Sequence, residues 1–177
     1  SENILINTHV LKCAAKSNVK KMLSMLSTCV YPAQTTYPLK EENIHKGEPH
    51  WTNFAYAYAK RMLDAHSRAC RKQYGSNFIT AIPNNMYGKN DNFHLEDSHV
   101  IPAMIRKMHE AKLNNTPVEL WGDGKPVREF TYAKDVANII LFLMEEYNEP
   151  DPINIGNTDS LSIGDLAASI KNIVGLK

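Results

Sequence analysis

Hydrophobic and polar positions follow two alternating patterns along the chain. Apolar side chains recur three and four residues apart over 3–17 and over 53–75, which predicts two helices. Continuous apolar runs at 22–26 and 78–82 have the length of one buried strand each. Between 32 and 49 the chain is polar and rich in breakers, so we expect a long loop there.

The remainder of the chain repeats this alternation. The stretch 83–98 is polar and rich in Asn, which indicates irregular structure. Asn53, Ser98 and the Ser162-x-x-Asp165 pattern are candidate helix N-caps. Beyond residue 98 we predict helices that begin near 98, at 135–147 and near 162, and short strands at 118–120, 127–131 and 153–156.

Helices and strands in alternation favour an α/β fold with a parallel sheet. The same periodicity selects the side chains expected to face the core. These are Ile4, Leu5, Leu11, Ala14 and Ala15 in the first helix, Met104, Ile105 and Met108 in the third, Val136, Ile139, Ile140 and Leu143 in the fourth, and Leu166, Ile170 and Ile173 in the last.

Composition narrows the class of protein. A chain of 177 residues with 43% hydrophobic and 22% charged residues suffices for one globular domain. A net charge of +1 offers no electrostatic reason for a nucleic acid or anionic membrane partner, and no apolar run approaches the ~18 residues of a membrane span. Cys13, Cys29 and Cys70 form neither a disulfide framework nor a zinc pattern, which fits a reducing compartment.

The first chemical candidate is Tyr56, the only Tyr followed four residues later by a Lys, Lys60. On a helix the two side chains are neighbours, and a nearby ammonium favours the phenolate, lowering the Tyr pKa from its ordinary value near ~10. Such a Tyr can protonate a carbonyl oxygen as a hydride arrives at the carbon. Ser27, at the end of the preceding strand, is placed to hold the same oxygen. The alternative is an ordinary surface pair at i and i+4.

Two further observations limit the interpretation. No strand–Gly-x-Gly-x-x-Gly–helix unit occurs, so the glycine-loop half of a dinucleotide-binding domain is absent and we expect the chain to be a fragment. His94, Glu96, Asp97 and His99 are close in sequence, but their spacing fits no recognised ligand pattern. No metal site is therefore predicted.

Several uncommon motifs occur together in one order. They are Ser27-Thr28-Cys29-Val30-Tyr31-Pro32, Tyr56-x-x-x-Lys60, Asn85-Met86-Tyr87-Gly88 followed by Asp91-Asn92-Phe93-His94, Ser98-His99-Val100-Ile101-Pro102, Trp121-Gly122-x-Gly124 and Arg128-Glu129-Phe130. Together they resemble the GDP-L-fucose synthase family of extended short-chain dehydrogenases/reductases, through almost the whole chain. Asn84 stands where that family usually has Thr, and Lys89-Asn90 where Pro-His is common.

The resemblance implies a fold, a reaction and a cofactor. The fold would be a partial Rossmann-like parallel sheet with flanking helices at 1–93, and part of a small α/β substrate domain at 94–177, with the chain crossing back to the first sheet. The family epimerises C3 and C5 of GDP-4-keto-6-deoxy-D-mannose and reduces C4 with NADPH. A cytoplasmic homodimer is implied, with no nucleic acid or membrane partner.

Catalytic roles follow from the resemblance. Cys29 would be the base and His99 the acid of epimerisation, because a thiolate and an imidazole can exchange protons at neutral pH. The alternatives are a buried structural thiol for Cys29 and a locally bonded helix-start residue for His99. Ser27, Tyr56 and Lys60 would carry the reduction.

Binding roles follow in the same way. Cofactor contacts would come from Leu26, Ser27, Thr28, Tyr56, Lys60, Pro83, Asn84, Asn85, Met86 and His99. Substrate contacts would come from Asn85, Lys107, Trp121 and Arg128, where Arg suits a diphosphate because its fork bonds two oxygens. Trp121 as a core anchor and Arg128 as the partner of Glu129 remain alternatives. So do a nucleotide-sugar 4-epimerase or 4,6-dehydratase, and a non-catalytic remnant or interaction module.

Overall fold

The computed structural model describes residues 2–176, which fold into two compact units. Unit 1 comprises the chain up to Asn84 together with Asp135–Gly156, and unit 2 comprises Asn85–Lys134 and the chain from Asn157 onward. The helices are α1 (Glu2–Lys16), α2 (Phe54–Tyr74), α3 (Val100–Asn114), α4 (Ala133–Glu146) and α5 (Ile163–Val174). The strands are β1 (Lys21–Met25), β2 (Asn77–Pro83), β3 (Asn85–Tyr87), β4 (Val127–Tyr132), β5 (Ile153–Ile155) and β6 (Ser160–Ser162).

Unit 1 is built on a parallel sheet in the order β1-β2-β5. Met22 pairs with Phe78 and Ala81 with Ile153, so β2 is the central strand of the three. A central parallel strand is covered on both faces, and this is why 78–82 reads as an uninterrupted apolar run. The predicted α/β fold with a parallel sheet is confirmed.

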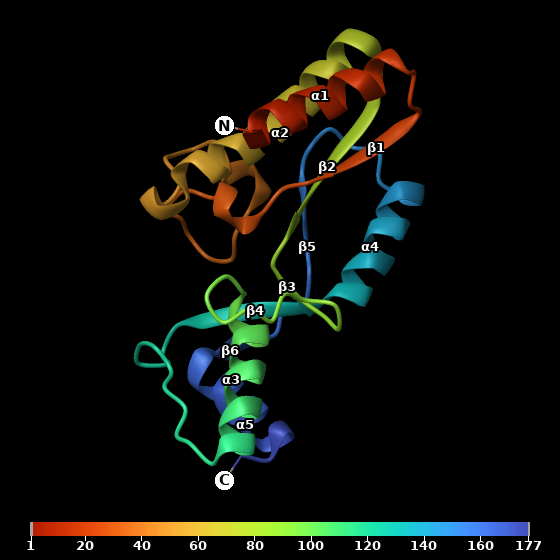
Figure 1. The fold of residues 1–177 in the computed structure, drawn as a ribbon. Helices are drawn as coiled ribbons and strands as arrows, with labels where there is room; N and C mark the ends of the chain where they lie inside the picture. The colour runs from red at the N-terminus through yellow and green to blue at the C-terminus, as the bar shows by residue number, and fades with distance from the viewer. Residues whose placement is uncertain (1, 177) are drawn as a thin grey trace. The chain divides into compact units, whose positions relative to one another are not determined.

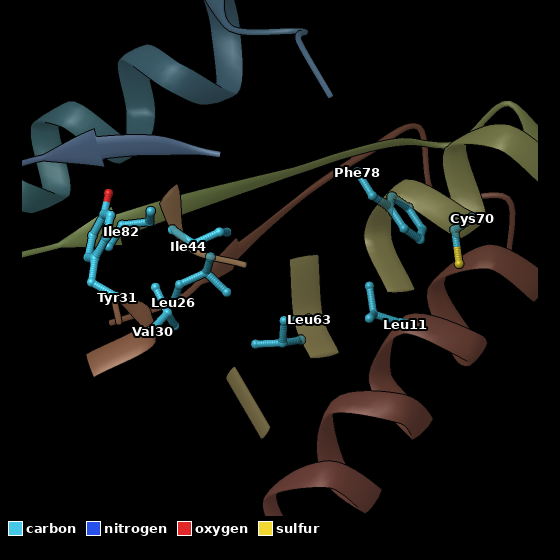
Figure 2. Packing of buried hydrophobic residues seen from close by; sticks show 9 residues of the cluster. All are labelled: Leu11, Leu26, Val30, Tyr31, Ile44, Leu63, Cys70, Phe78 and Ile82. Carbon is cyan, nitrogen blue, oxygen red and sulfur yellow. The ribbon is translucent and has the colours of Figure 1, made fainter. Parts of the chain in front are cut away.

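The two faces of β2 pack against different helices. Phe78 and Ile82 join Leu11 of α1 and Leu63 of α2 in one core cluster, shown in Figure 2. The intervening Ile79 and Ala81 pack against α4 and β5 in a second cluster. Figure 1 shows α1 and α2 running side by side on one side of β1 and β2. Alternate side chains of β2 thus point to opposite faces of the sheet, so that α1 and α2 cover one face and α4 covers the other.

Unit 2 contains a smaller mixed sheet in the order β3-β4-β6. β3 runs parallel to β4, and β4 runs antiparallel to β6. Helices α3 and α5 contact each other, and their apolar faces meet in a core of Met104, Met108, Leu166 and Ile170. Ser162 caps α5 by accepting a hydrogen bond from the Asp165 N–H at 3.0 Å, as the sequence pattern predicted.

Some local predictions were wrong. Ile4, Leu5 and Ile173 were expected in the core but are 37%, 59% and 85% exposed, because each lies off the packed stripe of its helix. Residues 118–120 form no strand, and Val118 packs its side chain against the core of unit 2 instead. The short strands β3 and β6 were missed, since three residues carry too little periodicity to be recognised. His99, and not Ser98, occupies the N-cap of α3.

The compact units divide at a different point from the domain boundary expected at residue 93. Residues 85–93 cluster with unit 2, because β3 pairs with β4 through Asn85 opposite Phe130. The return of the chain to the first sheet occurs through α4 and β5, both of which lie mainly in unit 1.

Candidate active site

The carboxyl end of β1 leads directly into a tight turn that carries Ser27 and Cys29. Leu26 continues the ladder, its N–H donating to the Ala81 carbonyl oxygen at 2.7 Å. Ser27 then caps a single 3₁₀ turn, Thr28–Val30, with its Oγ 3.4 Å from the Cys29 backbone nitrogen. Leu26 is buried, whereas Ser27, Thr28 and Cys29 are half-buried. The turn therefore holds a hydroxyl and a thiol at the end of a parallel strand, where ligands of α/β sheets bind.

Helix α2 places Tyr56 and Lys60 against this turn. Lys60 Nζ donates a 2.8 Å hydrogen bond to the Met25 carbonyl oxygen, and it lies 5.8 Å from the centroid of the Tyr56 ring. The Ser27 side chain is close enough to the Tyr56 hydroxyl to lower the pKa of the phenol. The structure thus brings together Ser27, Tyr56 and Lys60, as the chemistry of carbonyl reduction requires.

The electrostatics of Tyr56 differ from the prediction. Burial raises the pKa of Tyr56 above 10.0, the interaction with Ser27 lowers it, and the charge of Cys29 raises it. Burial lowers the pKa of Lys60. The expected decrease of the Tyr56 pKa by Lys60 is not seen, because partial burial disfavours the phenolate and the ammonium hydrogen bonds to the Met25 carbonyl oxygen.

The predicted cofactor loop is divided between the two units. Pro83 ends β2 as a buried residue, and the Asn84 N–H donates to the Ile155 carbonyl oxygen at 3.2 Å. Asn85 and Met86 begin β3 in unit 2 and are exposed. Asn85 Nδ2 donates to the Glu129 carbonyl oxygen at 2.9 Å, which fixes the orientation of its amide.

The remaining predicted residues belong to unit 2. His99 is exposed at the N-cap of α3 and makes no side-chain capping hydrogen bond. Lys107 Nζ lies 4.7 Å from the centroid of the Trp121 ring, a cation–π distance. Trp121 is 82% exposed, so the alternative that it anchors the core is excluded. Arg128 is exposed and donates to the Val127 carbonyl oxygen at 2.8 Å.

Two features of unit 1 were not found from the sequence. Arg61, next to Lys60, is only 6% exposed and bonds the turn that carries Cys29. Tyr31 donates to Asn154 Oδ1 at 2.6 Å, which ties the same turn to β5. A Lys-Arg pair on a helix usually indicates a solvated surface, and contacts across more than 100 residues leave no local signal.

Within residues 2–176 the structure groups no three His, Cys, Asp or Glu side chains in a way that would hold a metal ion. Over the same residues, each helix is too short or too polar to cross a bilayer.

Comparison with known proteins shows which family the chain belongs to. Residues 1–156 match the sequence profile described as the NAD dependent epimerase/dehydratase family. The chain belongs to this family.

Comparison with individual proteins gives a narrower result than the family profile. The chain is 45% identical over 178 residues to a GDP-L-fucose synthase of Dictyostelium discoideum, an alignment that covers 99% of this chain and 56% of the relative. It is 36% identical to the GDP-L-fucose synthase of Escherichia coli K12, covering 99% and 58%. The resemblance drawn from the motifs is confirmed, and the chain spans about half the length of these relatives.

Solved structures agree with the sequence comparison. A GDP-L-fucose synthetase from Naegleria fowleri bound to NADP superposes with a TM-score of 0.96 at 38% identity, covering 99% of this chain and 55% of that one. A GDP-mannoheptose C4 reductase from Campylobacter jejuni with NADP bound gives a TM-score of 0.88 at 31% identity, covering 99% and 63%.

Proposed function

We propose that this chain is part of an NADPH-dependent enzyme that converts GDP-4-keto-6-deoxy-D-mannose to GDP-L-fucose by 3,5-epimerisation and 4-reduction. The observation that carries the proposal is the grouping of Ser27, Tyr56 and Lys60 at the carboxyl end of β1. The identity with relatives named GDP-L-fucose synthase supports the choice of substrate.

For the reduction, bound NADPH would supply a hydride to C4 of the sugar. Tyr56 donates the proton that the C4 oxygen requires, and Ser27 orients that oxygen by hydrogen bonding. The raised pKa of Tyr56 keeps the phenol protonated at neutral pH, which is the form a proton donor needs.

Lys60 suits a role in cofactor binding. Its ammonium has three donors, and one of them bonds the Met25 carbonyl oxygen. The remaining donors are available for the ribose hydroxyls of a nicotinamide nucleotide. Leu26 and Thr28 from the turn, Pro83 and Asn84 from the end of β2, Asn85 and Met86 from β3, and His99 complete the proposed cofactor contacts.

For the epimerisation, the C4 ketone makes the C–H bonds at C3 and C5 acidic. Cys29 removes a proton from one face of the ring as the thiolate, and His99 returns a proton to the other face as the imidazolium. The half-buried position of Cys29 in its turn supports the assignment, because the thiol is neither sequestered in the core nor paired in a disulfide.

Substrate binding is assigned to exposed groups of unit 2. Lys107 and Arg128 supply positive charge for the GDP diphosphate, Trp121 supplies an aromatic face, and Asn85 supplies an amide. The exposure of Trp121 beside the Lys107 ammonium supports a surface that binds a ligand rather than a packed core.

A homodimer and a reducing, cytoplasmic location belong to the same proposal. Phe54, Tyr58 and Met62 recur four residues apart along α2 and are 38–49% exposed, and Ile6 and Val10 are exposed on α1, which packs on α2. An apolar stripe over two packed helices is suited to a second copy of the chain. The three cysteines are free thiols, which supports a reducing compartment. Sedimentation of wild type and Met62→Glu tests the dimer, which the variant is expected to weaken.

Deuterium exchange and NADPH oxidation test the proposed chemistry in the full-length protein. Cys29→Ser is expected to abolish solvent deuterium incorporation at C3. Tyr56→Phe is expected to leave exchange intact and to abolish NADPH oxidation. Exchange that persists in Cys29→Ser would show that another group is the base.

Two other functions give different results. A 4-epimerase or 4,6-dehydratase would retain its nucleotide tightly as NAD, whereas the proposed enzyme releases NADP; a UDP-N-acetylglucosamine 4-epimerase shares the fold with a TM-score of 0.82. A non-catalytic remnant would bind NADPH poorly. Calorimetry with NADPH on the 177-residue chain separates that possibility, since tight binding contradicts it.

A further inference from the structure

Two consecutive side chains of helix α2 hydrogen bond to the chain on either side of Cys29. Lys60 bonds the Met25 carbonyl oxygen at 2.8 Å, before Ser27 and Cys29 in the chain. Arg61 Nε bonds the Val30 carbonyl oxygen at 2.8 Å, immediately after Cys29. The four residues Leu26–Cys29 are therefore held at both ends by the helix that carries Tyr56.

The second hydrogen bond of Arg61 extends this anchor to the polar loop. Arg61 Nη1 donates to the Gly47 carbonyl oxygen at 2.7 Å, and its Cζ lies 5.3 Å from the Tyr58 ring centroid. Gly47 is close to the turn, since a Cβ added to it would meet the Pro32 ring at 3.2 Å. The Arg61 guanidinium thus connects α2 both to the turn Thr28–Val30 and to the loop at 32–49 that follows it.

The burial of this charge needs an explanation. Arg61 is 6% exposed, and among residues 2–176 it forms no salt bridge with a carboxylate. Desolvation of a guanidinium is costly unless its donors are well used. Two backbone carbonyl groups accept from Nε and Nη1, and Nη2 is buried with no partner among residues 2–176. The two bonds that Arg61 does make fix the turn that carries Cys29 and the loop that follows it.

We infer that Arg61 is a positioning residue for Cys29: it holds the turn at Val30 and so sets the orientation of the thiol. The inference rests on the proposed role of Cys29 as the base of epimerisation. The inference gives Arg61 and Lys60 different roles. Lys60 bonds the chain before the turn and serves the reduction, whereas Arg61 bonds the end of the turn and serves the epimerisation.

The test compares Arg61→Met with Arg71→Met in the full-length protein. Arg71 is a matched control on α2, because it also bonds a backbone carbonyl, that of Asn148 at 2.6 Å, but at the far end of the helix. Two rates are measured for each variant: deuterium incorporation at C3 of the keto sugar, and NADP⁺ reduction with GDP-L-fucose, which uses the reduction site in reverse.

Arg61→Met is expected to lower kcat for exchange at least tenfold, with KM and the rate of NADP⁺ reduction changed less than threefold. Arg71→Met is expected to leave the ratio of the two rates unchanged. Equal losses of both rates in Arg61→Met would show a general structural role and would overturn the inference, as would no loss of exchange.

A readout without substrate keeps this test separate from the proposed function. In a Cys13→Ser background, alkylation of Cys29 by iodoacetamide is followed by peptide mass spectrometry as a function of pH. Arg61→Met is expected to change the rate of Cys29 alkylation at least threefold across the pH range, because the turn is no longer held at Val30, and Arg71→Met to leave that rate unchanged. If wild type shows no exchange, the proposed function fails while this profile still decides the role of Arg61.

If Arg61→Met does not fold, Arg61→Lys is used. It keeps the charge but cannot bond both carbonyl groups, so a profile identical to wild type contradicts positioning.

Discussion

Lys60 Nζ donates a hydrogen bond to the carbonyl oxygen of Met25, the last residue of β1, at 2.8 Å. This bond connects the second turn of α2 to the carboxyl end of β1. Because Tyr56 lies one turn before Lys60, the phenol is placed by the sheet and not by the polar loop at 32–49. The residues of the reduction site thus lie on or beside a helix and a strand, which hold side chains more precisely than loops do.

The raised pKa of Tyr56 predicts how the reduction depends on pH. A Tyr whose pKa lies above its ordinary 10.0 stays protonated through neutrality, so the proton donor is retained as pH rises from 6 to 9. The rate of NADPH oxidation at saturating substrate, measured across that range, is expected to show no loss assignable to Tyr56. Phenolate absorbance that develops between pH 6 and 8 in wild type and is absent from Tyr56→Phe would contradict this.

Asp64 is expected to be a major contributor to stability. Its carboxylate is buried, lies 2.9 Å from His45 Nε2, and accepts hydrogen bonds from Arg68 at 3.0 Å and from Thr80. Asp64→Asn should lower the free energy of unfolding by about 3 kcal/mol, because it leaves partly buried donors unpaired. Urea unfolding monitored by circular dichroism measures the change.

The matched control for Asp64 uses the same partner. Asp151 also pairs with Arg68, at 2.9 Å, but its side chain is 71% exposed. Asp151→Asn should cost less than about 1 kcal/mol, as exposed ion pairs do. Similar costs for the two variants would show that burial of Asp64 does not determine its contribution.

Tyr31 predicts a loss of stability at alkaline pH. Burial raises its pKa from 10.0 to about 12, while the hydrogen bond to Asn154 lowers it and the charge of Glu41 raises it. The unfolded chain loses this proton first as pH rises above 10, so stability that is complete below pH 10 declines toward pH 12. The loss amounts to about 2–3 kcal/mol.

Tyr31→Phe tests this assignment. The variant should be less stable than wild type at pH 8, having lost the bond to Asn154, by about 1 kcal/mol. Its stability should then decline less between pH 10 and 12. Tyr37→Phe, at a residue that is 83% exposed, is the control and should follow the wild-type curve. A curve for Tyr31→Phe parallel to wild type would refute the prediction.

Gly156 is expected to tolerate no side chain. Its φ is +143°, and an added Cβ would lie 2.6 Å from the Asn84 side chain. Gly156→Ala should therefore cost about 3 kcal/mol or more, from backbone strain and steric overlap together. Thermal unfolding measures the change.

Gly75→Ala separates the two causes. Gly75 also has a positive φ, +67°, but nothing lies within 4 Å of an added Cβ. Its substitution should cost only about 1–2 kcal/mol. In Gly156→Ala, the additional change Asn84→Ala should recover part of the loss. No recovery would assign the whole cost to the backbone.

The amino-acid sequence alone determined the α/β class, the alternation of helices and strands, and the helix caps at Asn53 and Ser162, because periodicity and capping are local properties of the chain. Its motifs also predicted the grouping of Ser27, Tyr56 and Lys60. Only the tertiary structure decided the rest. The pKa of Tyr56 rises because burial disfavours the phenolate more than the Ser27 interaction favours it, and Arg61 is buried because the turn after β1 offers it a carbonyl group. Burial and long-range hydrogen bonds depend on residues far apart in the chain, and local patterns do not encode them.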